Sequence, residues 1–164
     1  MRTSGKILSR ALLVLLLAAG LPLGTQARPA NPAPQTSVAR VEQWLKDTGY
    51  QYRSTGTGTW VVNYPRRGGG NWPILVAAGG DFVVVGVVVA AKKEMNVTSE
   101  MMFKLLRLSH SLDYVKIGFD DDEDLFVRSE VKTKLLDSLE FKATVDRNAK
   151  AATTIYDEIK AFIE

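Results

Sequence analysis

The chain has 164 residues, none of them cysteine, and carries 21 basic and 18 acidic side chains. This length suits a single domain, and the lack of cysteine excludes disulfide bonds and a bacterial lipoprotein anchor in this sequence. Three of the basic residues and none of the acidic ones lie within residues 1–27, so residues 28–164 are electrically neutral. That balance argues against a surface for nucleic acid.

Residues 1–27 have the pattern of a secretory signal peptide. Basic residues precede an unbroken apolar run at residues 11–20, and Thr25 and Ala27 are small enough for a signal peptidase, so we expect cleavage after Ala27. An uncleaved membrane anchor is the alternative, although the apolar run is shorter than the roughly 20 residues of a membrane helix. We therefore expect an exported bacterial protein, periplasmic or secreted, with no membrane span once the signal is removed.

The segment at residues 28–36 is rich in proline and is predicted to be a flexible linker. Residues 37–164 are then the folded domain. Thr36 or Ser37 can cap a helix over residues 38–48, in which apolar side chains recur on one face. A glycine follows this helix and favours its end there.

Strands are predicted after the first helix. One lies within residues 50–64, chiefly at 59–64, and a second covers residues 72–78. A glycine-rich turn at residues 65–71 separates them. A third strand at residues 81–90 completes a three-stranded antiparallel meander.

The run DFVVVGVVVA at residues 81–90 is the most distinctive stretch of the chain. Valine and phenylalanine favour a strand. Because the side chains of both parities are apolar, we expect this strand to be covered on both faces. Gly86 in its middle indicates a bulge or a close approach of another backbone.

A cap at Asn96 or Thr98 can start a second helix that is apolar on most sides. A hairpin is predicted next, with strands at residues 114–119 and 125–128. A final helix follows a cap at Asp137. Together these elements predict an α+β fold in the order α-βββ-α-ββ-α, with helices packed on a five-stranded antiparallel sheet.

This chain resembles the bacterial YbjN-type domains in its element order, its valine-rich run and the stretch SLDYVKIGFDDDEDLFVRSE at residues 111–130. Those domains are similar in fold to the type III secretion chaperones, and the resemblance covers roughly residues 38–162. The family often has Asp-Gly at the hairpin tip, whereas this chain has Glu123-Asp124, which leaves the turn type open. The resemblance implies a tendency to dimerise and to bind partner polypeptides, and it implies no catalytic residues. Because secretion chaperones act in the cytoplasm, an exported relative would not simply inherit their role.

Five consecutive acidic residues at 120–124 form the sharpest local motif. Asp120, Asp122 and Asp124 match the first half of a calcium loop, but its glycine and its distant glutamate are missing. A calcium-dependent interaction module is one alternative function on this basis. A carboxylate-based hydrolase or transferase is another, if two carboxylates of this hairpin, Glu130 included, meet in a cleft with raised pKa values. A solvated tip that prevents edge-to-edge aggregation explains the same residues, so we predict no metal site and no cofactor.

Apolar residues of the second helix are the remaining candidate site. Met101, Met102, Phe103 and Leu106 are predicted to form a patch for a partner, and a fully buried core helix is the alternative. His110 is the only histidine, which excludes two-histidine metal sites and most acid–base relays. With no catalytic constellation, the sequence predicts an exported, non-enzymatic binding module, chaperone-like and homodimeric. A peptide or an envelope protein is the expected further partner.

Overall fold

The computed structural model describes residues 36–163, so the predicted signal peptide and all of the predicted linker except Thr36 lie outside them. Six strands form one antiparallel sheet in the order β1-β2-β3-β4-β6-β5. The elements in chain order are α1 (Ser37–Thr48), β1 (Tyr52–Gly56), β2 (Thr59–Pro65), β3 (Asn71–Gly79), β4 (Phe82–Ala90), η1 (Lys92–Glu94), α2 (Ser99–Ser111), β5 (Lys116–Phe119), β6 (Leu125–Lys132), η2 (Thr133–Leu135), α3 (Ser138–Ile159) and η3 (Lys160–Phe162).

The first helix begins and ends where the sequence predicted. The Thr36 hydroxyl accepts a hydrogen bond from the Ala39 N–H at 3.3 Å, which satisfies one of the free donors at the helix start. Gly49 ends α1 in the left-handed conformation with φ of 74°. The buried side chains of α1 are Val41, Trp44 and Leu45.

The sheet has six strands where five were predicted. The region at residues 50–64 contains two strands, β1 and β2, joined by a tight turn at Thr57 and Gly58. Gly58 permits this turn because its φ is +71°, and a Cβ on it would lie 2.6 Å from the carbonyl oxygen of Ala78. The element order is therefore α-ββββ-α-ββ-α.

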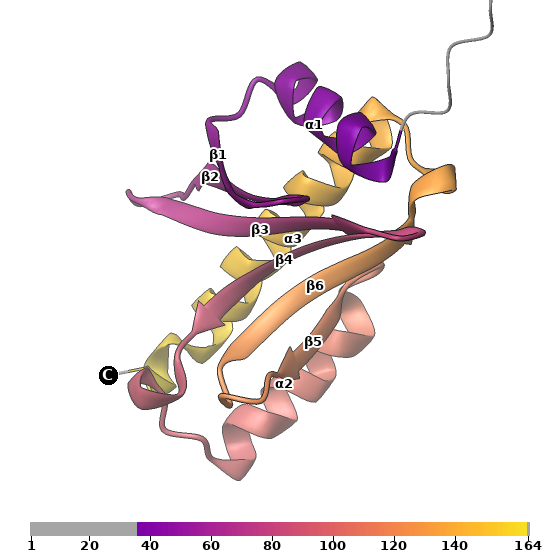
Figure 1. The fold of residues 1–164 in the computed structure, drawn as a ribbon. Helices are drawn as coiled ribbons and strands as arrows, with labels where there is room; N and C mark the ends of the chain where they lie inside the picture. Colours follow the sequence, from indigo (N-terminus) through magenta and orange to yellow (C-terminus); the bar gives the residue numbers. More distant parts are fainter. Residues whose placement is uncertain (1–35, 164) are drawn as a thin grey trace, which may run out of the picture. The chain divides into compact units, whose positions relative to one another are not determined.

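Helices cover one face of the sheet within the described residues. In Figure 1, α3 runs behind the sheet, where it packs against β3, β4 and β6. The helix α1 lies against α3 and β3, and α2 lies against α3 and β5. The core fills the space between, and its largest fully buried side chains are Phe141, Leu45, Ile74 and Met101.

Among residues 36–163, the valine strand β4 is covered on one face, not on both as predicted. Its odd-numbered valines, from Val83 to Val89, are buried, whereas Phe82 and Val88 on the opposite face are 45% and 44% exposed. Antiparallel sheets commonly leave one face to water. The prediction from the sequence was therefore wrong: although both the even-numbered and the odd-numbered side chains of β4 are apolar, only the odd-numbered ones face a covering layer.

Gly86 marks the close backbone approach that the sequence suggested. A Cβ at Gly86 would lie 3.0 Å from the Cβ of Arg128 on the neighbouring strand β6. The irregularity in this strand pair lies further along, between Val88 and Ala90. Gly86 therefore serves the β4–β6 contact and not a bulge.

The predicted hairpin is present, with β5 paired to β6. At its tip, the Glu123 N–H donates to the carbonyl oxygen of Asp120 at 3.0 Å, and Glu123 itself has a φ of 62°. This left-handed position favours glycine. The sequence did not decide the type of this turn, and the structure shows that the turn places backbone strain at Glu123.

The final helix also begins as predicted. An oxygen of the Asp137 carboxylate accepts a hydrogen bond from the Glu140 N–H at 2.8 Å, which caps the first turn of α3. The buried stripe runs along the whole helix and contains Phe141, Val145, Ala149, Ala152, Ile155 and Ile159.

No helix among residues 36–163 is long and apolar enough to cross a membrane.

Candidate functional site

The outer side of α2 carries three of the four residues predicted to bind a partner. Met102, Phe103 and Leu106 are 37%, 63% and 65% exposed. Met101 is fully buried, so its side chain belongs to the core and cannot form part of a contact surface. The sequence left core and surface as alternatives for this helix, and the structure divides the helix between them.

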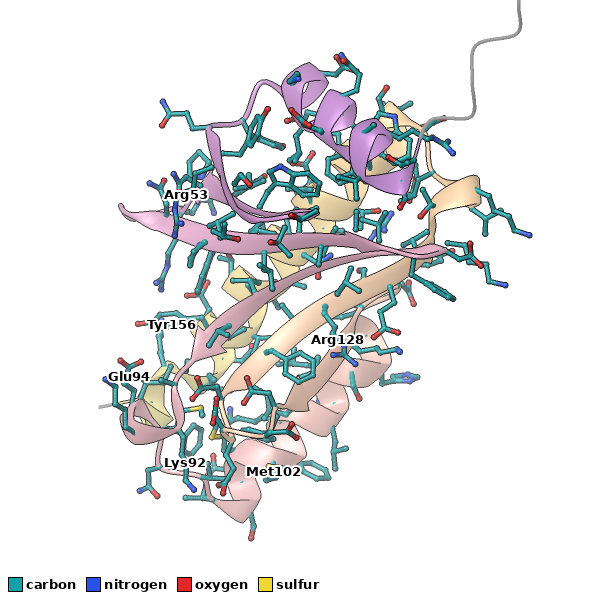
Figure 2. The ribbon with its side chains drawn as sticks, in the orientation of Figure 1. Arg53, Lys92, Glu94, Met102, Arg128 and Tyr156 are labelled. Carbon is teal, nitrogen blue, oxygen red and sulfur yellow. The ribbon has the colours of Figure 1, made fainter. Side chains whose placement is uncertain are left out.

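The start of α2 sets this division. The Thr98 hydroxyl accepts a hydrogen bond from the Met101 N–H at 3.2 Å, and from this start Met101 and Leu105 face the core. Residues four apart share a helix face, so Met102 and Leu106 lie together on the outer side, with Phe103 beside them. We call these three exposed residues the α2 stripe; Figure 2 shows where Met102 lies.

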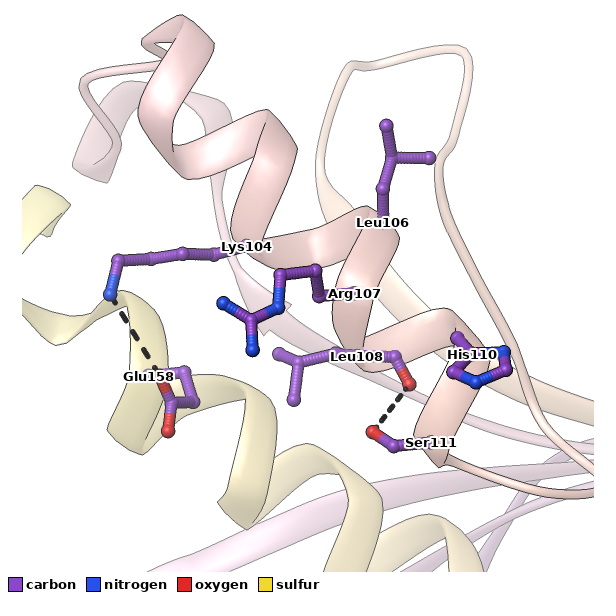
Figure 3. A pocket seen from close by; sticks show the side chains of 7 residues that line it. All are labelled: Lys104, Leu106, Arg107, Leu108, His110, Ser111 and Glu158. Carbon is purple, nitrogen blue, oxygen red and sulfur yellow. Dashed lines mark hydrogen bonds and ion pairs between the residues drawn. The ribbon is translucent and has the colours of Figure 1, made fainter.

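An open pocket of about 570 Å³ borders the α2 stripe (Figure 3). Its lining residues are Lys104, Leu106, Arg107, Leu108, His110, Ser111 and Glu158. The Lys104 ammonium lies 3.9 Å from the Glu158 carboxylate of α3, and the Ser111 hydroxyl donates to the carbonyl oxygen of Leu108 at 3.1 Å. These polar groups make structural contacts within and between the two helices. The pocket therefore does not suggest a catalytic pair.

Within residues 36–163, no helix covers the other face of the sheet, and this face carries exposed apolar side chains of β3 and of the valine strand β4, part of which the sequence suggested as apolar surface. Leu75 of β3 is 46% exposed, close to the exposure of Phe82 and Val88 on β4. Leu75 lies opposite Gly86 and so is a diagonal neighbour of Val88, whereas Phe82 lies six residues from Val88, near the other end of β4. We call these three residues, spread along one face, the sheet patch. Only an alternation of polar and apolar residues would have identified this face from the sequence, and β3 and β4 are apolar at both parities.

A charged cluster lies on the same face of the sheet. Glu130 of β6 is 3.0 Å from the Lys116 ammonium and 2.9 Å from the Arg128 guanidinium, and Figure 2 shows Arg128 on this face. The hydrogen bond from Lys116 lowers the pKa of Glu130, and the charges of Lys116 and Arg128 act in the same direction. A carboxylate acting as a general acid near neutral pH needs a raised pKa. Glu130 therefore does not support the carboxylate-enzyme alternative.

The acidic hairpin uses its carboxylates for local structure. One Asp120 oxygen accepts hydrogen bonds from the N–H groups of Asp122 and Asp124, at 3.1 and 2.9 Å. Asp124 accepts another from the Lys92 N–H at 2.8 Å, and the Lys92 ammonium pairs with Glu123 at 2.6 Å. Across residues 36–163, no group of three or more histidine, cysteine or acidic side chains could hold a metal ion. The geometry thus gives no support to the calcium-dependent alternative.

A cluster of Tyr50, Lys142 and Asp146 has strongly shifted protonation equilibria. The Tyr50 hydroxyl donates to Asp146, and the Lys142 ammonium donates to the Tyr50 oxygen at 2.8 Å and to Asp146 at 3.0 Å. Burial and then the hydrogen bond to Asp146 raise the pKa of Tyr50 to about 12. Hydrogen bonds to Tyr50 and then to Asp146 raise the pKa of Lys142.

These shifts indicate a structural role for the cluster. Both Tyr50 and Lys142 hold their protons more firmly than usual, whereas a general base needs a pKa near the working pH. Burial acts to raise the pKa of Asp146, but its hydrogen bonds with Tyr50 and Lys142 outweigh that effect and lower it. The cluster attaches the segment after α1 to α3, and because 92 residues separate Tyr50 from Lys142, no local sequence pattern predicted it.

No family model and no curated protein matches this sequence. Solved structures do match its fold. One is a chain of the heterodimeric ExoU–SpcU complex from the type III secretion system of Pseudomonas aeruginosa, with a TM-score of 0.57 and 16% identity over 74% of this chain and 98% of that chain. Another comes from the Yersinia pestis type III secretion chaperone SycH in complex with a stable fragment of YscM2, with a TM-score of 0.55 and 13% identity over 73% and 99% of the two chains.

A third similar structure is YbjN from Escherichia coli. It has a TM-score of 0.53 and 15% identity, and the match covers 76% of this chain and 91% of YbjN. Identities this low relate folds and not activities. The YbjN-type resemblance of the sequence is confirmed at that level: the chain has the α+β fold found in YbjN and in type III secretion chaperone complexes.

Proposed function

We propose that this chain is an exported, non-enzymatic binding module that binds a polypeptide partner and forms a homodimer through α2. The observation that carries this proposal is the α2 stripe. Met102, Phe103 and Leu106 place three large apolar side chains together in water, on a helix whose opposite side is already buried in the core. Contiguous exposed apolar groups of this kind mark interaction surfaces.

The proposed binding of a polypeptide is supported by the solved structures of similar fold. Two similar structures are complexes of two proteins, the ExoU–SpcU heterodimer and SycH with a fragment of YscM2. Chains of this fold therefore take part in contacts with other polypeptides. For the present chain, the sheet patch of Leu75, Phe82 and Val88 offers an apolar surface for such a partner.

A second copy of the chain suits the α2 stripe. A two-fold dimer needs one patch that is complementary to itself, and the three side chains of the stripe are all apolar. Leu106 lies four residues from Met102 and three from Phe103, and these are the spacings that let two helices interdigitate. Dimerisation through α2 leaves the sheet patch available for the polypeptide partner.

The proposed location and lack of catalysis have separate support. The signal-peptide pattern of residues 1–27 favours the periplasm or the cell exterior. The protonation equilibria of Tyr50, Lys142 and Glu130 are shifted away from the values that acid–base catalysis at neutral pH requires. N-terminal sequencing of protein recovered from the cell envelope should start at Arg28 if export and cleavage occur as proposed.

The dimer is tested by charge substitution on the α2 stripe. The variant Met102→Glu/Phe103→Glu should be monomeric by light scattering after size exclusion, with the far-UV circular dichroism of the wild type. A matched control, Leu135→Glu/Leu139→Glu, changes two other exposed apolar residues and should remain dimeric. A monomeric wild type would overturn the dimer, and a collapsed fold in the α2 variant alone would show that the stripe belongs to the core.

A further inference from the structure

The strand β6 continues past the end of its neighbour β5. The pairing of the two strands begins at Lys116, opposite Arg128, whereas β6 runs on to Lys132 and stays paired with β4 up to that residue. Extending the register of β5 by two residues would place Tyr114 opposite Glu130. Within the described residues, this end of β6 is therefore an edge, although β6 is otherwise an interior strand of the sheet.

Two hydrogen bonds fix the direction in which the backbone of Glu130 points. On the side of β4, the Thr133 N–H donates to the carbonyl oxygen of Asp81 at 2.8 Å; on the side of β5, the Asp120 N–H donates to the carbonyl oxygen of Asp124 at 3.1 Å. In an antiparallel pair, directly bonded residues alternate along the strand. The odd-numbered residues of β6 therefore bond to β4, and the N–H and C=O of the even-numbered ones, Glu130 included, point to the side of β5.

The backbone of Tyr114 does not complete this ladder. Tyr114 leaves the extended conformation with a φ of 62°, and its carbonyl oxygen accepts a hydrogen bond from the Ser129 hydroxyl at 2.8 Å. No backbone hydrogen bond between Tyr114 and Glu130 is formed in residues 36–163. A left-handed conformation is unfavourable for a tyrosine, and strain of this kind gathers at functional sites.

A pocket of about 740 Å³ lies along this edge. Glu130 and Val131 of the edge line it, together with Tyr114 and Leu135, whose side chains are 81% and 67% exposed. The Arg147 guanidinium lies 5.1 Å from the ring centre of Tyr114 and helps to hold the ring beside the pocket. The pocket therefore presents a backbone donor and acceptor between two exposed apolar side chains.

The charges around this pocket are largely compensated. Lys116 and Arg128 both pair with Glu130, at 3.0 and 2.9 Å, and Arg147 pairs with Glu140 at 3.2 Å. A small anion would thus have to compete with carboxylates that already hold these cations. A ligand that uses backbone hydrogen bonds and apolar contacts suits the site better.

We propose that this edge binds an extended segment of the polypeptide partner, which adds to β6 as a strand beyond the end of β5. The N–H and C=O of Glu130 bond to the backbone of the segment, and alternate side chains of the segment contact Tyr114 and Leu135. This inference rests on the proposed function, which names a polypeptide partner but no mode of binding. The site uses no residue of the α2 stripe or the sheet patch.

Amide hydrogen exchange, followed by NMR on the purified protein, tests the open edge without a ligand. The Val131 N–H faces β4 and should exchange slowly, whereas the Glu130 N–H should exchange as fast as a solvent-exposed amide. Equal protection of the two amides would overturn the open edge. Protection of Glu130 that disappears on dilution would assign the edge to a second copy of the chain, which would also overturn the proposal.

Random heptapeptides displayed on phage serve as the probe for the ligand, and the peptide most enriched on the wild type is then synthesised. Its binding should protect the Glu130 N–H from exchange. N-methylation at successive positions of the peptide should have an alternating effect. It should weaken binding several-fold where the N–H faces β6 and have no effect at the intervening positions, whose N–H groups face away. Equal effects at all positions would contradict strand addition.

Proline substitutions test the same alternation in the protein. Glu130→Pro removes an N–H that points out of the sheet, so this variant should keep the wild-type far-UV circular dichroism and lose peptide binding. The matched control Val131→Pro removes an N–H that faces β4 and should destabilise the fold. Glu130→Gln removes the same charge, keeps the N–H and should bind the peptide. A folded Glu130→Pro that binds as Glu130→Gln does would overturn the site; if Glu130→Pro does not fold, the N-methylated peptides decide.

The location of the peptide distinguishes failure of this inference from failure of the proposed function. A selected peptide that shifts the amides of Leu75 and Val88 but not that of Glu130 would overturn the edge site and leave the binding of a polypeptide in place. Enrichment of no heptapeptide on the wild type would contradict both.

Discussion

The turn between β1 and β2 should not tolerate a side chain at Gly58. Its φ is +71°, and an added Cβ would lie 2.6 Å from the carbonyl oxygen of Ala78 and 3.2 Å from a methyl of Val38. The same close approach forms a hydrogen bond from the Ala78 N–H to the Gly58 carbonyl at 2.7 Å. Because that bond holds β3 against the turn, Gly58→Ala must distort the hairpin, β3 or the contact with α1.

The expected loss of stability can be estimated from these contributions. A left-handed alanine costs about 1–2 kcal/mol, and the lower entropy of its unfolded chain offsets about 0.4–1 kcal/mol of that. Stretching or breaking the buried hydrogen bond adds roughly 1–2 kcal/mol, and the steric contact adds to this. We expect Gly58→Ala to lower the free energy of unfolding by about 2–3 kcal/mol.

Two other glycines provide matched controls in urea unfolding followed by tryptophan fluorescence. Gly49 has a φ of +74° with no atom within 4 Å of an added Cβ, so Gly49→Ala should show the backbone cost alone, about 1 kcal/mol or less. Gly79 has neither a positive φ nor a nearby atom, and Gly79→Ala should be nearly neutral. If Gly58→Ala is no more destabilising than Gly49→Ala, the argument from close approach is wrong.

Two further predictions concern pH and calcium. Folding stability should fall by about 1 kcal/mol as the pH rises from about 10 to about 12. The pKa of Tyr50 is raised to about 12 in the folded protein. In this pH range the unfolded chain therefore loses the Tyr50 proton while the folded chain still holds it. Tyr50→Phe should reduce this fall in urea unfolding at each pH, and an unchanged profile would refute the role of the cluster. Calcium should shift the melting temperature no more than magnesium at the same concentration, since Asp120 and Asp124 accept backbone hydrogen bonds. A calcium-specific increase would revive the calcium-dependent alternative.

Local sequence signals predicted the helices well, because their causes are local. Thr36, Thr98 and Asp137 each accept the capping hydrogen bond expected from their position before an apolar run. The spacing of apolar residues along α3 likewise identified its buried stripe. The missed strand β1 is the exception: its burial pattern is nearly all exposed, so it lacks the apolar alternation by which strands are recognised.

The sequence by itself determined an α+β fold with capped helices, a valine-rich strand inside the sheet, and equal numbers of acidic and basic residues in 28–164. Tertiary structure alone decided which apolar side chains are covered. Met101 and Met102 are neighbours of one type, yet one is buried and the other is exposed, because α3 and β5 lie on only one side of α2. The Tyr50 cluster was likewise invisible, since Tyr50 and Lys142 are 92 positions apart and their convergence depends on the folded path of the chain.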